Sequence, residues 1–130
     1  MKFIRIIHKD TKGLVVRISE LLAEKTINID KIDAHAKDGF ARIRLYTSDN
    51  DKALSVLNEA GYRGVPDMHI LVKISDKPGE LARVSRLLYD NDMDIRSITM
   101  IGQNEDENIV AIVTDQDDKA KIVLEKYLIS

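Results

Sequence analysis

The chain has 130 residues, and its 20 Lys and Arg against 22 Asp and Glu leave a formal charge of −2. Its 44% hydrophobic and 32% charged residues are typical of a globular protein, and the balanced charge argues against a nucleic-acid binder that depends on a strongly positive surface. The absence of cysteine excludes disulfides, zinc–thiolate sites and thiol nucleophiles.

The first elements are a strand that ends near His8 and, after a loop through Gly13, a helix. The helix is predicted by apolar residues at helical spacing, namely Val15, Ile18, Leu21 and Leu22. A second strand is expected over about 29–36 and a third over 41–47, with a turn between them. A helix over about 49–60 follows, ended by the next glycine, with a short strand expected at 62–65.

The second half follows the same order. Residues 68–74 alternate apolar and polar side chains, as a strand does, and a Ser-Asp-Lys-Pro-Gly loop leads to a helix. The apolar residues of that helix are Leu81, Val84, Leu87 and Leu88. Two strands are then expected, over about 95–102 and 109–114.

The two halves are copies of one module. Shifting the chain by 66 residues aligns identical pairs at Asp10, Gly13, Arg17, Ser19, Leu21, Leu22, Ile29 and Ile32. After a one-residue insertion, a shift of 67 aligns six more, at Thr47, Asp51, Lys52, Ala53, Val56 and Leu57. So many matches in one order indicate internal duplication, with modules over 1–66 and 67–130.

The element order predicts an α+β fold, two tandem ferredoxin-like βαββαβ modules. Right-handed crossovers place both helices on one face of an antiparallel sheet, in the strand order 4-1-3-2. The chain ends at Ser130, so the second module lacks most of its last strand. We expect strand 62–65 to pair with the first strands of both modules and so cover the exposed edge.

The repeated loop resembles that of a known family. A strand ending in Ile-Ser-Asp-Lys-Pro-Gly-Glu-Leu, a helix closing on Leu-Leu, and Asp-Met-Asp-Ile-Arg-Ser-Ile are similar to the ACT domain, a small regulatory module that binds amino acids. The resemblance covers both halves, although the first loop, residues 10–13, keeps the Asp and Gly and lacks the Pro. It implies a tandem ACT-domain protein.

The resemblance also implies a ligand between two modules, held by one module's first loop and the start of a neighbour's second strand. The ligand-binding residues carried over by position are Asp76, Gly79, Asn28, Asp10, Gly13, Asp94 and His8. A glycine allows close backbone approach, a helix N-terminus attracts a carboxylate, and an Asp can accept from an ammonium group. Of the two pairings we favour Asp76 and Gly79 with Asn28. The other, Asp10 and Gly13 with Asp94, would place two carboxylates at one site.

A purely structural interpretation stays open. Asp10 and Asp76 stand where a helix N-cap belongs, and capping alone would account for both. His8 is expected to be a partly buried residue at the end of a strand. The three histidines have no metal-ligand spacing, so no metal or cofactor is expected.

The outer sheet face of the second module is predicted to be apolar. The side chains concerned are Leu71, Ile101, Ile109, Ala111 and Val113. An exposed patch of this kind predicts a homodimer through that face or through the module edges. The first module has Arg42 and Arg44 there instead, but the aromatic pattern of RNA-recognition modules is absent, so no nucleic-acid partner is expected.

No pattern of a catalytic site is present in the sequence. The favoured function is a non-catalytic, amino-acid-binding regulatory protein, and the alternative is an assembly subunit of an amino-acid biosynthetic enzyme. No apolar run reaches the roughly 20 residues of a membrane helix, and the N-terminus lacks a signal-peptide core, so we expect a cytoplasmic protein away from membranes.

Overall fold

The chain forms two compact units, residues 1–67 and 68–130, which are described separately. The computed structural model describes residues 3–66 and 69–129. Within these ranges no helix is long and apolar enough to cross a membrane.

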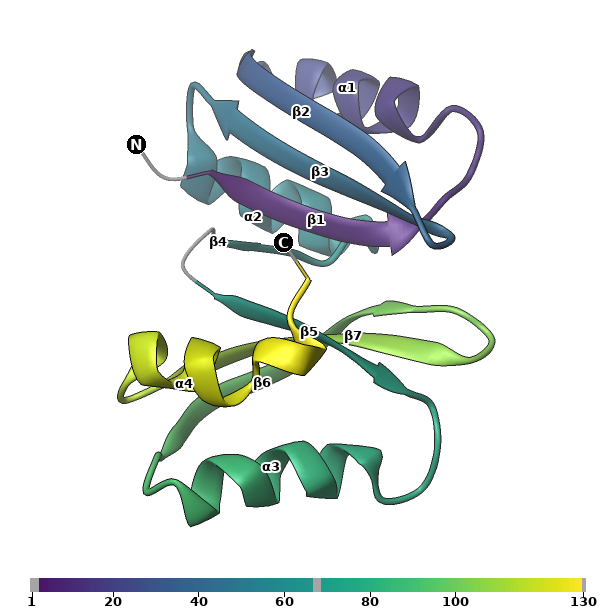
Figure 1. Cartoon of the computed structure of the whole chain (residues 1–130). Coiled ribbons are helices and arrows are strands. Elements are labelled where there is room, and N and C mark those ends of the chain that lie inside the picture. Colours follow the sequence, from purple (N-terminus) through teal and green to yellow (C-terminus); the bar gives the residue numbers. More distant parts are fainter. Residues whose placement is uncertain (1–2, 67–68, 130) are drawn as a thin grey trace. The chain divides into compact units, whose positions relative to one another are not determined.

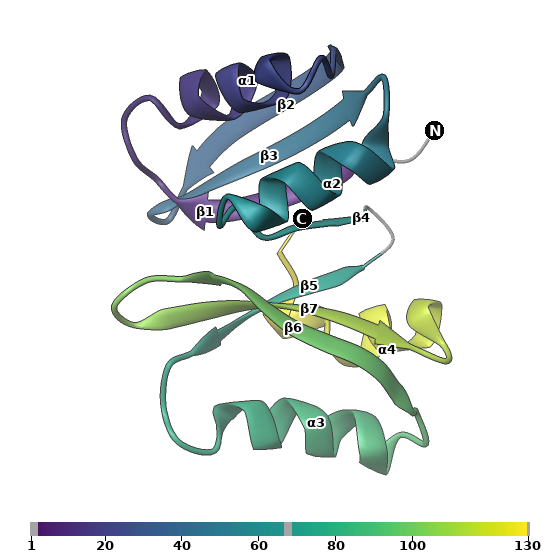
Figure 2. The ribbon, with the colours of Figure 1, turned by 180° about the vertical axis from the view of Figure 1, so that it is seen from behind.

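The first unit has the predicted ferredoxin-like topology. Its elements in chain order are β1 (Ile4–Lys9), α1 (Leu14–Glu24), β2 (Ile29–Lys37), β3 (Phe40–Thr47), α2 (Asn50–Glu59) and β4 (Gly64–Pro66). The strands form one antiparallel sheet in the order β2-β3-β1-β4, which is the order expected from right-handed crossovers. Both helices cover the same face of this sheet, in front of it in Figure 2 and behind it in Figure 1.

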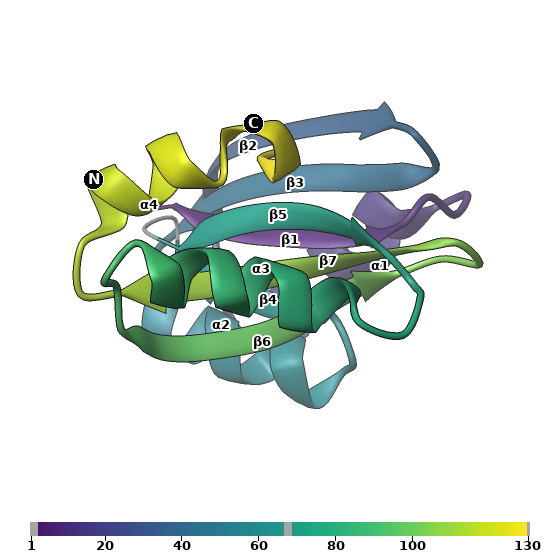
Figure 3. The ribbon, with the colours of Figure 1, turned by 60° about the horizontal axis from the view of Figure 1, so that its bottom comes forward.

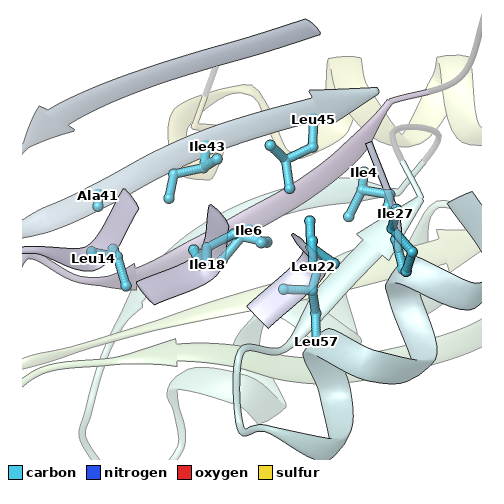
Figure 4. Close-up of a cluster of buried hydrophobic side chains, with 11 residues drawn as sticks. Ile4, Ile6, Leu14, Ile18, Leu22, Ile27, Ala41, Ile43, Leu45 and Leu57 are labelled. Atoms are coloured by element: carbon cyan, nitrogen blue, oxygen red, sulfur yellow. The ribbon is translucent and has the colours of Figure 1, made fainter. Parts of the chain in front are cut away.

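The core of this unit lies between that sheet face and the two helices. Ile4 and Ile6 of β1 alternate with outward-facing residues and pack against Ile18 and Leu22 of α1, as strand and helix periodicity predict. Figure 4 shows these side chains together with Leu14, Ile27, Ala41, Ile43, Leu45 and Leu57.

A tight hairpin joins β2 to β3 and positions the nearby loop. Asp38 and Gly39 both have positive φ, 55° and 82°, as a two-residue turn of this twist requires. The flanking pair Lys37 and Phe40 starts a regular antiparallel register. The end of the hairpin lies beside the loop after β1, because the Asp10 N–H donates to the Gly39 carbonyl at 3.0 Å.

The second unit repeats this arrangement. It contains β5 (Ile70–Ser75), α3 (Glu80–Asp90), β6 (Ile95–Gln103), β7 (Glu107–Thr114), α4 (Asp117–Val123) and a short 3-10 turn at Glu125–Tyr127. Its strands form a separate antiparallel sheet in the order β5-β7-β6. Figure 3 shows α3 and α4 over one face of that sheet. The predicted α+β fold of two ferredoxin-like modules is therefore confirmed.

Two residues near the end of the described range contact the edge of β5, the equivalent of the edge that β4 covers in the first unit. Leu128 forms a single antiparallel bridge with Val72 of β5, and the Ile129 N–H donates to the Leu71 carbonyl at 3.0 Å. In the first unit β4 pairs with β1, as expected. The predicted pairing of the same strand with the first strand of the second unit stays a prediction.

The predicted apolar residues of the second sheet lie on the face opposite its core. Leu71, Ile109 and Ala111 alternate along β5 and β7 with residues of the core cluster, as expected, and none of them belongs to that cluster. Homodimerisation through this face stays a prediction.

Candidate functional site

The loop after β1, residues 10–13, is held by hydrogen bonds at both ends. Besides the bond from the Asp10 N–H to the hairpin, the Arg17 guanidinium donates to the Lys12 carbonyl and to Thr11 Oγ1, both at 2.9 Å. Gly13 stands at the N-cap of α1 with a φ of 79°, a left-handed conformation that glycine adopts at no steric cost. These bonds and the Gly13 conformation fix the path of the loop into the first turn of α1.

Neither loop aspartate caps its helix, so the capping interpretation is wrong. The N-caps of α1 and α3 are Gly13 and Gly79, and neither helix receives a side-chain cap. Backbone N–H groups in the first turn of α1 are consequently left without a side-chain acceptor. Asp10 is exposed, and its carboxylate makes no hydrogen bond within residues 3–66 and 69–129.

A cavity of about 280 Å³ lies behind this loop, entirely within the first unit. Its lining comes from the loop, the first turn of α1 and strands β2 and β3. The residues are Asp10, Thr11, Gly13, Leu14, Val15, Val16, Ala34, His35, Ala36, Ala41 and Ile43. Leu14, Ala41 and Ile43 are labelled in Figure 4, where they belong to the cluster beneath the helices. The cavity thus combines an apolar floor with a polar rim.

The register of the sheet explains why there is space. Ala34 lies opposite Ile43, and Ala36 opposite Ala41, so three alanines share the strand face that carries the core. Because an alanine side chain is small, it leaves space above the sheet at each of these positions, and this space forms the cavity. His35 lies opposite Arg42, on the other face, so the floor itself presents no charged side chain.

The loop after β5 has a backbone similar to that of the first loop, but its aspartate side chain has a different environment. The Asp76 N–H donates to the Asp106 carbonyl at 2.8 Å, and Gly79 has a φ of 89°, matching the first loop. Here, however, Asn108 Nδ2 donates to Asp76 Oδ1 at 3.0 Å. Asn108 is only 4% exposed, and its Oδ1 is buried with no hydrogen-bond partner among the described residues.

Two predicted residues at the starts of second strands lie outside the lining of the cavity. Asn28 is exposed and donates twice: its Nδ2 donates to Asp30 Oδ1 at 2.6 Å, and its backbone N–H donates to Ser48 Oγ at 3.0 Å. The Asp94 N–H donates to Asp115 Oδ1 at 2.9 Å. Asp94 lines a separate acidic hollow with Asp90, Asp92, Asp115, Tyr89 and Met93.

His8 is a partly buried residue at the end of β1. Its Nδ1 lies 2.8 Å from the Lys9 carbonyl oxygen, and its ring centroid lies 5.4 Å from that of Tyr62. It is not among the residues that line the cavity. Among the described residues, no three His, Asp or Glu side chains are grouped as a metal would require.

The residues that shape the cavity were missed by the sequence analysis. Of the predicted ligand-binding set, the cavity brings together Asp10 and Gly13, whereas Ala34, Ala36 and Ala41 were not singled out. Searching the repeat for identical residues concealed them, because at these positions the copies differ. A comparison of side-chain size between the copies would have identified Ala41 against Asn108.

The comparisons with known proteins agree with the topology. A family model of the ACT domain matches residues 68–125. A crystal structure of protein BT0572 from Bacteroides thetaiotaomicron is 24% identical, covers 98% of this chain and 90% of its own, and superposes with a TM-score of 0.50, which shows the same fold. No curated protein matches.

Two further solved structures have lower scores. The regulatory subunit of aspartate kinase from Thermus thermophilus, in its ligand-free form, is 18% identical with a TM-score of 0.43, over 96% of this chain and 90% of that one. The small subunit of acetolactate synthase from Thermotoga maritima is 15% identical with a TM-score of 0.41, over 100% of this chain and 91% of that one.

Proposed function

We propose that this chain, whose residues 68–125 belong to the ACT domain family, is a non-catalytic regulatory protein that binds an amino acid at the loop after β1. The family match supports the regulatory role. The observation that carries the proposal is the cavity of about 280 Å³ behind residues 10–13, at the loop where the resemblance places ligand contacts. A ligand there would contact side chains of one unit alone.

The chemistry of the cavity fits the two charges that every amino acid carries. The uncapped N-terminus of α1 attracts a carboxylate, through free N–H groups and the helix dipole. The Asp10 carboxylate at the rim can accept from an ammonium group. The apolar floor leaves the side chain of the ligand to be recognised by shape and hydrophobic contact.

Regulation follows if binding changes the conformations available to the loop. A ligand that contacts both Asp10 and the first turn of α1 stabilises one arrangement of the loop, and an enzyme that binds this surface can respond to that arrangement. The second predicted pairing, at Asp76 and Gly79 with Asn28, stays a prediction, as does a ligand shared between modules.

Calorimetry of the full chain against each of the twenty amino acids tests the proposal. We expect one or a few related amino acids to bind, and Asp10→Asn to weaken that binding by removing the carboxylate at the rim. Glu24→Gln is the matched control, because it also removes one exposed carboxylate, at the end of α1 that is opposite to the cavity.

Two results would contradict the proposal. One is a screen in which no amino acid binds, which would favour the alternative of an assembly subunit that acts through protein contacts. The other is equal weakening by Asp10→Asn and Glu24→Gln, which would place the effect in the overall charge and not in the cavity.

A further inference from the structure

The strand register identifies equivalent positions in the two units. Ala36 lies opposite Ala41 between β2 and β3, and Gln103 lies opposite Asn108 between β6 and β7. Likewise Ala34 lies opposite Ile43, and Met100 opposite Val110. Three alanines of the first unit thus correspond to Met100, Gln103 and Asn108 in the second, and each replacement is larger and can fill space.

Asn108 occupies the position that Ala41 leaves open. Its side chain is buried at 4% exposure, and its amide donates to Asp76, the carboxylate equivalent to Asp10. The buried Oδ1 of Asn108 has no partner among the described residues, which is unfavourable for a polar atom. The second loop thus has its aspartate already occupied from inside its own unit.

We propose that the two loops have diverged: the first binds an amino acid with an aliphatic side chain, whereas Asn108 closes the equivalent position of the second. This inference rests on the proposed function, because it names the ligand class of that site. It differs from the sequence-based expectation, which favoured the loop of Asp76. One chain then binds one ligand.

The ligand class follows from the size and lining of the cavity. Sites for drug-sized ligands occupy roughly 300–1,000 Å³, so about 280 Å³ suits a small molecule. The floor consists of Leu14, Ile43 and the alanines, none of which offers a hydrogen-bonding side chain to a polar ligand. A charged ligand side chain would be desolvated there without a partner, which is unfavourable, whereas an aliphatic one gains hydrophobic burial.

Titration calorimetry on the full chain tests the inference with valine, leucine and isoleucine against lysine, aspartate and phenylalanine. We expect one equivalent of an aliphatic amino acid to bind the wild-type chain. Ala41→Asn, which transfers the closing side chain into the first unit, should weaken binding by about tenfold or more, as expected when a pocket loses space. Asn108→Ala should free Asp76 and create a second binding equivalent.

Two further variants keep the test interpretable. Ala36→Gln introduces the residue found opposite Asn108, at an exposed position of an edge strand, and should weaken binding even if Ala41→Asn fails to fold. Ala60→Asn makes the same chemical change as Ala41→Asn at the exposed end of α2 and should leave binding unchanged.

The outcomes separate this inference from the proposed function. If no amino acid binds the wild-type chain, both are overturned. If an amino acid binds with two equivalents, if a charged or aromatic one is preferred, or if the folded Ala36→Gln and Ala41→Asn variants bind normally, only the inference is overturned. A single equivalent in Asn108→Ala would likewise refute the closing role of Asn108.

Discussion

Replacing Gly13 or Gly79 by alanine separates two costs that the structure assigns to these positions. Both glycines have a left-handed backbone, with φ of 79° and 89°, so an alanine at either site is strained by about 1–2 kcal/mol. Only at Gly13 would the new Cβ meet a neighbour, Arg17 Nη1 at 3.2 Å, whereas Gly79 has nothing within 4 Å.

The contact at Gly13 adds a second cost. The Arg17 guanidinium must shift by a few tenths of an ångström, which disturbs its hydrogen bonds to the Lys12 carbonyl and Thr11 Oγ1. Such bonds contribute about 0.5–1.5 kcal/mol each, and exposure puts these at the lower end. We therefore expect Gly13→Ala to lower the free energy of unfolding by about 0.5–1 kcal/mol more than Gly79→Ala does.

The assay is urea denaturation followed by circular dichroism, with amide hydrogen exchange to assign the loss to one unit, because the two units can unfold separately. In an Arg17→Met background the excess cost of Gly13→Ala should disappear, since the guanidinium is gone. Equal costs for the two glycine substitutions, or an excess that persists without the guanidinium, would refute the reasoning.

Three other stability predictions can be measured in the same way. Gly64→Ala should cost about 1–3 kcal/mol, because its Cβ would lie 3.2 Å from Ile4 Cγ2 and 3.3 Å from Leu54 Cδ2, whereas Gly61→Asn meets no atom within 4 Å and should cost less, namely the strain of a φ of +90° alone, which Asn tolerates better than most residues. Asp49→Ala should lower the free energy of unfolding by about 1 kcal/mol, because it removes the N-cap bond from the Lys52 N–H. Gln116→Ser should raise it by up to about 1 kcal/mol, since α4 has no side-chain cap, and changes of the same sign in the two variants would contradict the capping argument. Leu128→Ser should destabilise the second unit alone and speed amide exchange in β5, because Leu128 forms the single bridge to Val72 and packs against the core; protection unchanged in β5 would contradict this.

The secondary structure was predictable because its signals are local. The alternation over 68–74 and the helical spacing of Val15, Ile18, Leu21 and Leu22 depend only on near neighbours in the chain. The structure has a strand over Ile70–Ser75 and a helix over Leu14–Glu24, in keeping with both. The turn before β3 was equally clear, since Asp-Gly is a strong hairpin signal. The glycine that follows α2 ends it as predicted, with a φ of 90°.

The helix caps and the sheet edge were not predictable in the same way. Asp10 and Asp76 have the chemistry of N-caps, yet each loop continues to a glycine before its helix begins. The backbone N–H of each aspartate donates to the hairpin of its own unit. The edge of β5 is met by Leu128, a contact across more than fifty residues that no local pattern encodes.

The sequence by itself determined the duplicated module, its elements and its strand order, because periodicity and chain connectivity leave few alternative folds. Only the tertiary structure decided that the two loops differ, with a cavity at Asp10 and a hydrogen bond from Asn108 at Asp76. The physical reason is that a strand distant in sequence supplies the residue behind each loop: Ala41 lines the cavity in the first unit, whereas Asn108 donates to Asp76 in the second. The repeat that identified the module is therefore also what hid the difference between its copies.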